Sequence, residues 1–191
     1  MHLNLWHGID EVSRGRTRVW NPFGFGWRIY DEVITEEVKG RNGSAVISYA
    51  IMTNAVVASV EVSLVKGNRK SLARLYGTIT ASMTGWDVKR VLFCKKRDKY
   101  INVDCGAPIP LLRSVLIIPR ASSLHIDADL ADAFSFPNVS VANGSLQFSP
   151  EFYGDFAETI SGKYGEIKVN VKWWSYFNHP DTDKVRERCF F

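Results

Sequence analysis

The sequence predicts an all-β protein: an antiparallel β-sandwich of two sheets, jelly-roll-like or C2-like, preceded by an N-terminal arm rich in aromatic residues and glycine. Two observations favour this fold. Apolar and polar side chains alternate with a period of two in several segments, as in strands that bury one face. No segment carries a helical apolar stripe over three turns, and Pro, Asn and Gly separate the alternating runs.

The length of 191 residues is typical of one domain, and 46% hydrophobic residues exclude a wholly disordered chain. A change in amino-acid composition and patterning divides the chain into three predicted parts. They are the arm, residues 1–44, the sandwich, residues 45–178, and a C-terminal tail, residues 179–191.

The arm centres on residues 21–27, where glycines alternate with Phe and Trp. Glycine supplies a flexible backbone and the rings supply large apolar surfaces. We interpret this stretch as an extended arm whose rings cover the core or a neighbouring subunit, with an aromatic ligand-binding loop as the alternative. Residues 31–38 fit a short helix or a charged strand, and the sequence leaves both open.

Four segments of the predicted sandwich alternate most clearly, and each places one set of apolar side chains on the inner face of a sheet. These sets are Val60, Val62 and Leu64; Leu75, Gly77 and Ile79; Leu124, Ile126, Ala128 and Leu130; and Ile167, Val169, Val171 and Trp173. Turns are predicted at residues 66–68, 142–145 and 162–165, because Asn and Gly tolerate a positive φ.

The charge pattern disfavours a nucleic-acid partner. The net charge is +4, the basic residues are dispersed, and no stacking aromatics alternate with the densest basic run, residues 95–99. No signal peptide and no apolar run of about 18 residues is found, so we expect a cytoplasmic protein without a membrane span. Asn-x-Ser sequons at Asn42, Asn138 and Asn143 leave a secretory location open.

The three cysteines, Cys94, Cys105 and Cys189, form no CxxC pair, which excludes a zinc ribbon and a thioredoxin motif. We expect free thiols in a reducing compartment. No Gly-x-Ser-x-Gly elbow and no phosphate-binding loop occurs, and no cofactor is predicted.

The best polar cluster is His125, Asp127 and Asp129, which alternate along one predicted strand and share its outer face. Steps of about 7 Å are too long for all three to hold one ion without a bend. We interpret the cluster as the polar side of an amphipathic strand, with a calcium or transition-metal site as the alternative.

Exposed aromatic side chains are the candidates for ligand binding. Trp173 and Trp174 are adjacent, so in a strand one of them must face outward. An outward ring can stack on a sugar, cover a partner or lie under the arm. The candidate ligand-binding residues are Trp27, Trp86, Trp174 and Tyr176.

Residues 60–174 resemble a plant domain of unknown function, common in grasses and sometimes attached to ribosome-inactivating N-glycosidase domains. The segments that carry the resemblance are residues 60–64, 75–81, 91–93, 123–130 and 160–169. The resemblance implies a non-catalytic all-β accessory module linked to plant defence or stress. It supplies no catalytic residues, and the chain lacks the Ser-x-x-x-Glu-Ala-x-Arg pattern of the N-glycosidase helix.

We therefore expect a non-catalytic binding or self-association module that forms a homo-oligomer or binds a protein partner. One alternative is a lectin-like carbohydrate-binding protein that uses exposed tryptophans. Another is a metal-dependent enzyme that uses the His125 face.

Overall fold

The computed structural model describes residues 2–7, 10–16, 33–39, 43–50, 52, 54–67, 72–134 and 139–175. The chain forms two compact units, Met1–Thr53 and Asn54–Phe191. Each unit is described by itself.

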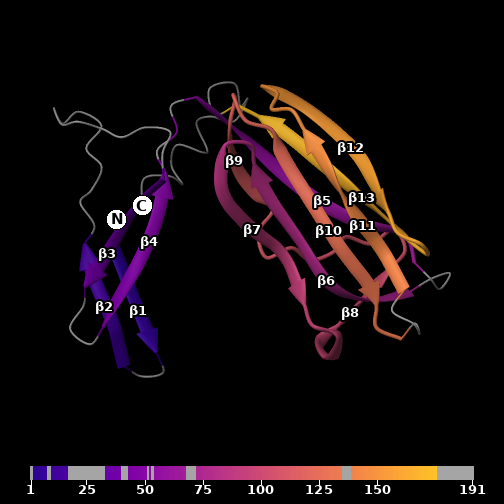
Figure 1. Ribbon diagram of the computed structural model, residues 1–191, viewed down its shortest axis with the longest axis horizontal. Helices are drawn as coiled ribbons and strands as arrows, with labels where there is room; N and C mark the ends of the chain where they lie inside the picture. The colour runs from indigo at the N-terminus through magenta and orange to yellow at the C-terminus, as the bar shows by residue number, and fades with distance from the viewer. Residues whose placement is uncertain are drawn as a thin grey trace. The chain divides into compact units, whose positions relative to one another are not determined.

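The first unit contains four strands in two antiparallel hairpins (Figure 1). The strands are β1 (His2–His7), β2 (Asp10–Arg16), β3 (Val33–Lys39) and β4 (Ser44–Ala50); β1 pairs with β2 and β3 with β4. The sequence left residues 31–38 open between helix and strand, and the structure forms a strand from Val33 onward. The aromatic and glycine-rich stretch 21–27 lies outside the described residues.

The division between the two units falls between Thr53 and Asn54. The sequence placed the start of the sandwich at residue 45, whereas the structure pairs Ser44–Ala50 with β3. The predicted tail, residues 179–191, lies outside the described residues and stays a prediction.

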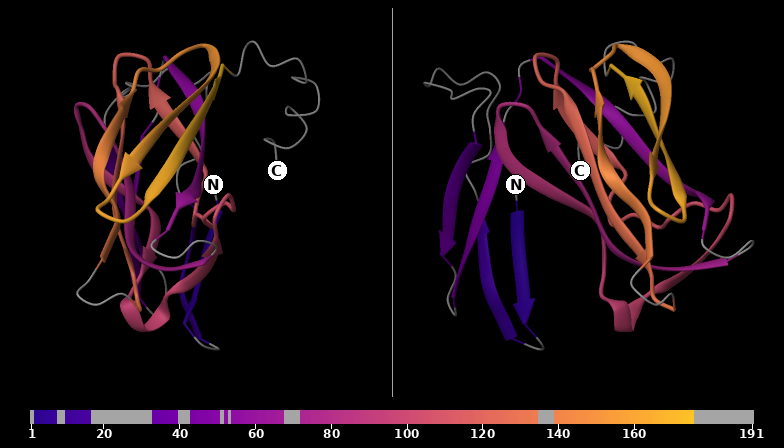
Figure 2. Two further views of the ribbon diagram at one scale, coloured as in Figure 1. Left: turned by 90° about the vertical axis from the view of Figure 1, so that its right-hand side faces the viewer. Right: turned by 45° about the vertical axis from the view of Figure 1, so that its right-hand side comes forward.

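The second unit is a sandwich of two antiparallel sheets, as the alternation predicts (Figures 1 and 2). The five-stranded sheet has the order β11-β10-β6-β7, with β8 also pairing with β6, and the four-stranded sheet has the order β12-β13-β5-β9. The strands of the first sheet are β6 (Leu72–Met83), β7 (Trp86–Lys95), β8 (Ile101–Asp104), β10 (Leu124–Asp132) and β11 (Val139–Phe148). Those of the second are β5 (Ala55–Lys66), β9 (Val115–Pro119), β12 (Tyr153–Ser161) and β13 (Glu166–Trp174), and one 3-10 turn, η1 (Arg97–Lys99), follows β7.

The core lies between the inner faces of the two sheets. The apolar positions predicted to face inward are buried in β5, β6, β10 and β13, apart from Gly77, which is half-buried. Fully burying one such Val or Leu side chain contributes roughly 1.5–3 kcal/mol, so these rows supply most of the stability of the sandwich. Trp173 is 0% exposed while Trp174 is half-buried, which confirms that one of the pair faces outward.

One predicted turn is wrong. Residues 142–145 continue strand β11, where Asn143 pairs with Asp129 and Gly144 with Ala128. The glycine serves packing here: a Cβ at position 144 would lie 3.2 Å from Cγ2 of Ile160 on the other sheet. The turn predicted at residues 162–165 is confirmed, because it joins β12 to β13 and Gly162 N–H donates to the Gly165 carbonyl at 2.9 Å.

Candidate functional site

The predicted polar cluster lies on the outer face of the five-stranded sheet, on alternate residues of β10. Each member has its own partner. His125 Nε2 lies 3.0 Å from Thr84 Oγ1, and Asp127 Oδ2 lies 4.0 Å from Lys89 Nζ. Asn143 Nδ2 donates to Asp129 Oδ1 at 3.2 Å.

These partners lie on different elements, Thr84 in the β6–β7 turn, Lys89 on β7 and Asn143 on β11, so the structure draws the three side chains apart rather than toward one point. Across the described part of the chain, no three His, Cys, Asp or Glu residues lie close enough together to hold a metal ion. The nearby Asp132 is buried, and its Oδ1 accepts a hydrogen bond from the backbone N–H of Phe134 at 3.0 Å. Asp132 therefore caps the turn after β10.

Two of the four candidate ligand-binding aromatics, Trp27 and Tyr176, lie outside the described residues. Trp86 and Trp174 are both half-buried and lie on different sheets. Trp86 begins β7 and shares a side of that strand with Val88, which lines the gap between the sheets. The structure therefore does not bring Trp86 and Trp174 onto one face.

An apolar row crosses the outer face of the four-stranded sheet at the end where β5 begins. Its four members are cross-strand partners, one from each strand, and all are exposed or half-buried: Tyr153, Trp174, Val57 and Ile117. Tyr153 is 74% exposed and Ile117 47% exposed. Sequence reasoning found Trp174 but missed the row, because the four residues are far apart along the chain and only strand register aligns them.

The loop before β12 exposes a further aromatic ring, one residue before Tyr153 of the row. Phe152 is exposed, and the Arg120 guanidinium carbon lies 3.7 Å from the centre of its ring. A cation over a ring face at this distance is a cation–π contact. This contact links the β9–β10 turn to the start of β12.

The rest of the same outer face carries charges of both signs. Lys168 and Lys172 are exposed on β13, Asp155 is exposed on β12 and Glu61 on β5. Asp155 and Lys172 are direct cross-strand partners next to the apolar row. A face that carries both signs can match a copy of itself turned by a two-fold axis.

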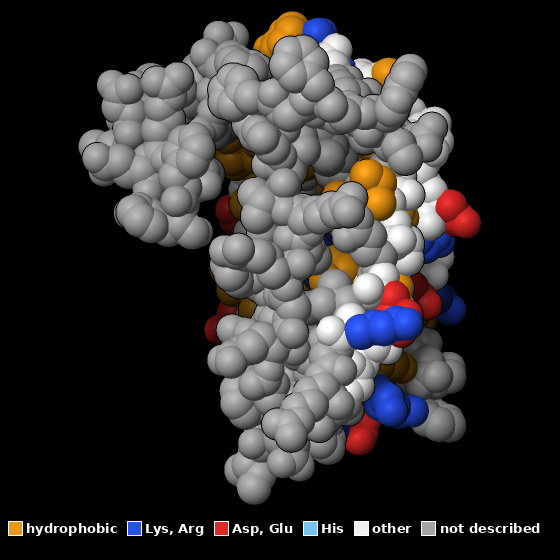
Figure 3. All heavy atoms as spheres, turned by 90° about the vertical axis from the view of Figure 1, so that its left-hand side faces the viewer, with side chains coloured by type: hydrophobic (Ala, Val, Ile, Leu, Met, Phe, Trp, Pro, Cys, Tyr) orange, Lys and Arg blue, Asp and Glu red, His pale blue; other side chains and the backbone are white. Residues whose placement is uncertain are grey.

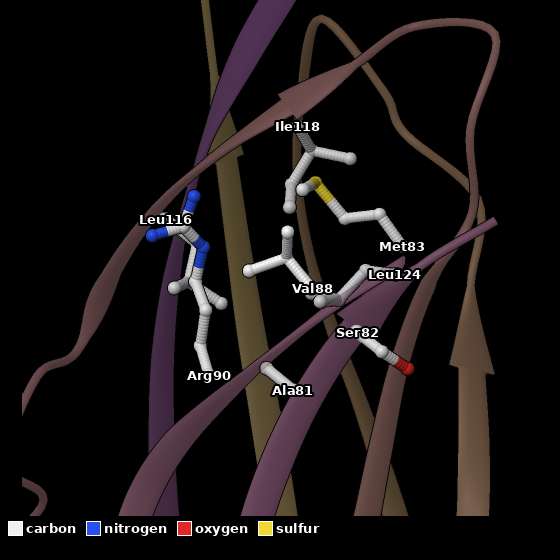
Figure 4. Close-up of a pocket in the computed structure, with 8 residues that line it drawn as sticks. All are labelled: Ala81, Ser82, Met83, Val88, Arg90, Leu116, Ile118 and Leu124. Carbon is white, nitrogen blue, oxygen red and sulfur yellow. The ribbon is translucent and has the colours of Figure 1, made fainter. Parts of the chain in front are cut away.

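A narrow hollow lies where the edge strands β7 and β9 close the gap between the sheets (Figure 4). Met83, Val88 and Ile118 point toward one another there, while the hydroxyl of Ser82 points away (Figure 4). The hollow has no room for a water molecule. It is therefore an edge of the core and not a ligand site.

The basic run at residues 95–99 lies at the end of the sandwich opposite the apolar row, where β7 ends and η1 follows. Arg97 Nη2 donates to the Ala133 carbonyl at 3.1 Å, and the Arg74 guanidinium carbon lies 4.1 Å from the centre of the Phe134 ring. The Tyr100 ring meets the same Phe134 edge-on at 5.5 Å. On the described part of the face in Figure 3, basic and acidic side chains are interspersed rather than gathered into one basic surface.

Of the cysteines within the described residues, Cys94 is exposed and Cys105 half-buried, and both are free thiols. Cys189 lies outside the described residues. No helix in the described part of the chain has the length and apolar character needed to cross a membrane.

The sheets and their outer faces define a class of protein: an antiparallel β-sandwich domain whose prominent surface features are an apolar cross-strand row and a polar outer sheet face. The sequence profile of the domain of unknown function DUF6598 matches residues 10–171. The chain belongs to this family. No curated protein and no solved structure matches it significantly.

Proposed function

We propose that this protein is a non-catalytic module that self-associates through the outer face of its four-stranded sheet. The observation that carries the proposal is the apolar row of Tyr153, Trp174, Val57 and Ile117, which crosses every strand of that sheet. An apolar surface of this kind, rimmed by polar residues, is typical of an interaction site.

The size of the face supports a second copy of the chain as the partner. Four strands about 4.8 Å apart and about nine residues long span roughly 600 Å², near the 800 Å² that one partner buries in a standard interface. The exposed charges beside the row are of both signs, Lys168 and Lys172 with Asp155 and Glu61, so the face carries no uniform charge that would repel a second copy.

The mass of the full chain in solution tests this proposal, measured by sedimentation velocity over a range of protein concentrations. We expect a reversible dimer. Ile117→Lys and Tyr153→Lys each place an unpaired charge in the apolar row and should weaken the dimer at least about tenfold, because an unpartnered charge is costly to desolvate. Ser145→Lys is the matched control, since it adds the same charge on an exposed position of the other sheet.

A monomeric full chain at every concentration would overturn the proposal. Dimers of unchanged strength in both row variants would also overturn it, because they would place the interface elsewhere.

Carbohydrate binding by exposed tryptophans is the second candidate. Trp174 and Tyr153 are cross-strand neighbours and form a two-ring platform of the kind on which a sugar stacks. A titration of tryptophan fluorescence with soluble oligosaccharides should then show saturable quenching that Trp174→Leu removes. Absence of quenching excludes this candidate and leaves self-association untouched.

Two finer expectations accompany the main proposal. The resemblance to the grass domain supports an accessory role in plant defence, beside N-glycosidase domains. The free thiols of Cys94 and Cys105 support a cytoplasmic location.

A further inference from the structure

The outer face of the five-stranded sheet contains a hollow lined by Tyr76, Gly77, Asp129, Ala131 and Ser140. We propose that this hollow binds a small neutral polyhydroxyl ligand, such as a single sugar ring. It lies on the sheet opposite the apolar row, so this proposal does not depend on self-association or on the tryptophan platform.

The size of the hollow fits one ring. Its volume is about 240 Å³. One water needs only about 10–15 Å³, and sites for drug-sized ligands span roughly 300–1,000 Å³. A single sugar ring lies between these limits, whereas an oligosaccharide would have to continue along the sheet surface.

The fold builds the hollow from small residues beside one large one. Tyr76 on β6, Ala131 on β10 and Ser140 on β11 are cross-strand partners in one row. The register of β10 against β11 shifts between Leu130 and Ala131, which marks a bulge at this point. Bulges bend strands and are frequent next to binding sites.

Gly77 forms part of the lining, and no other residue fits there. Its φ is 120°, in the region that L-residues rarely adopt, and a Cβ would overlap the carbonyl oxygen of Asp129. The backbones of β6 and β10 therefore approach closely beneath the hollow, and no side chain at position 77 can fill it.

The polar groups of the lining match hydroxyl groups. Ser140 Oγ is buried and has no hydrogen-bond partner among the described residues. Asp129 Oδ1 accepts from Asn143 Nδ2 at 3.2 Å, which holds the carboxylate at the rim of the hollow. A sugar hydroxyl both donates and accepts, so it can bond the Asp129 carboxylate and, once the Ser140 side chain turns toward the hollow, the serine hydroxyl as well.

The same lining disfavours a metal ion. Calcium takes about 6–8 oxygen ligands, most often from several carboxylates, and among the described residues that line this hollow Asp129 is the one carboxylate. The neighbouring Asp127 is already paired with Lys89. The half-buried Tyr76 supplies instead a ring wall against which the apolar face of a sugar packs.

Backbone NMR of the full chain, titrated separately with glucose, galactose, mannose, xylose and sorbitol, tests the proposal. We expect saturable shifts of the Gly77, Ala131 and Asn143 amides with at least one of these probes, and a Kd on the order of 1–10 mM. Ala131→Leu fills the hollow without touching its polar groups and should weaken binding more than about tenfold. Ser145→Leu adds the same side chain to the same sheet face outside the hollow and should leave binding unchanged.

Ser140→Ala provides a second variant if Ala131→Leu disturbs the fold. It removes the unpartnered hydroxyl and should weaken binding several-fold while the spectrum of the free protein stays that of the parent chain. The proposal would be overturned if none of the probes gave a saturable shift at concentrations up to about 100 mM. A Kd above that concentration would be too weak for a formed binding site. Shifts confined to Trp174 would overturn the proposal as well, because they would place sugar binding on the other sheet. Tetramethylammonium serves as a cationic probe of the Asp129 carboxylate and the Tyr76 ring. A response to this cation but to none of the sugars would also overturn the proposal.

Discussion

The two outer faces of the sandwich follow the same period-two pattern but differ in chemistry. On the four-stranded sheet, the outward positions at one end are Tyr153, Trp174, Val57 and Ile117, and they join into an apolar row. On the five-stranded sheet, the outward positions of β10 carry His125, Asp127 and Asp129, each bonded to a neighbouring polar side chain. Alternation therefore determines which side chains leave the core, but it does not determine whether the surface they form is apolar or polar.

This difference gives the two faces different expected roles. Apolar side chains that are in register across several strands expose a contiguous area that water solvates poorly, and a second protein surface can cover it. Polar side chains that already satisfy one another gain little from a protein partner, except where one of them lacks a bond, as Ser140 does.

The largest expected effect comes from comparing the inner and outer sides of one strand. Trp173→Ala should lower the free energy of unfolding by about 3–5 kcal/mol, because it leaves a cavity in the core. Trp174→Ala, one residue further and half-buried, should change it by no more than about 1 kcal/mol. Urea denaturation of both variants measures the difference, and equal losses would mean that the two rings do not lie on opposite sides of β13.

Trp173→Phe sharpens the same comparison. The indole Nε1 of Trp173 is buried and has no hydrogen-bond partner among the described residues. Replacing the ring by Phe removes this unsatisfied donor and keeps much of the apolar volume, so it should cost clearly less than Trp173→Ala.

The next effect separates two glycines of the five-stranded sheet. Gly77→Ala should destabilise the protein by at least about 2 kcal/mol, because it combines a positive φ with overlap of the Asp129 carbonyl. Gly144→Ala should cost less than about 1 kcal/mol, since its Cβ would only press against the end of the Ile160 side chain. Thermal denaturation compares the two, and a larger loss for Gly144→Ala would contradict the described geometry of β6.

The smallest effect concerns the exposed ion pair on the polar face. Asp127→Asn should change stability by less than about 0.5 kcal/mol, because Lys89 and Asp127 are partly exposed and 4.0 Å apart. Zinc or calcium should leave the melting temperature of the parent chain unchanged. A rise with either ion that the variant abolishes would instead support the metal site considered for His125, Asp127 and Asp129.

Much of the fold could be predicted from the sequence because each core strand shows its inner face in its own residues. The runs at 60–64, 124–130 and 167–173 are examples, and their inward positions are buried. The turn predicted at residues 142–145 failed because Asn and Gly also occur inside strands, where an asparagine can bond a neighbouring strand and a glycine can allow close packing. Only the paired strands distinguish these cases.

The surfaces were less predictable for the same reason. Trp174 was a candidate from the sequence. Tyr153, Val57 and Ile117 could not be recognised as its neighbours, because only the strand register places them beside it. The hollow likewise depends on the alignment of Tyr76, Ala131 and Ser140 from three strands. Register reflects the whole set of inter-strand contacts, and no single segment encodes it.

The glycine at position 77 also constrains how this surface can change over evolution. A substitution there strains the main chain of β6 and pushes it from its neighbour, so selection for a stable sheet preserves the concavity whether or not a ligand occupies it. The hollow can then be filled by a larger side chain at Ala131 or Ser140, and a chain that keeps both of these residues small retains the hollow.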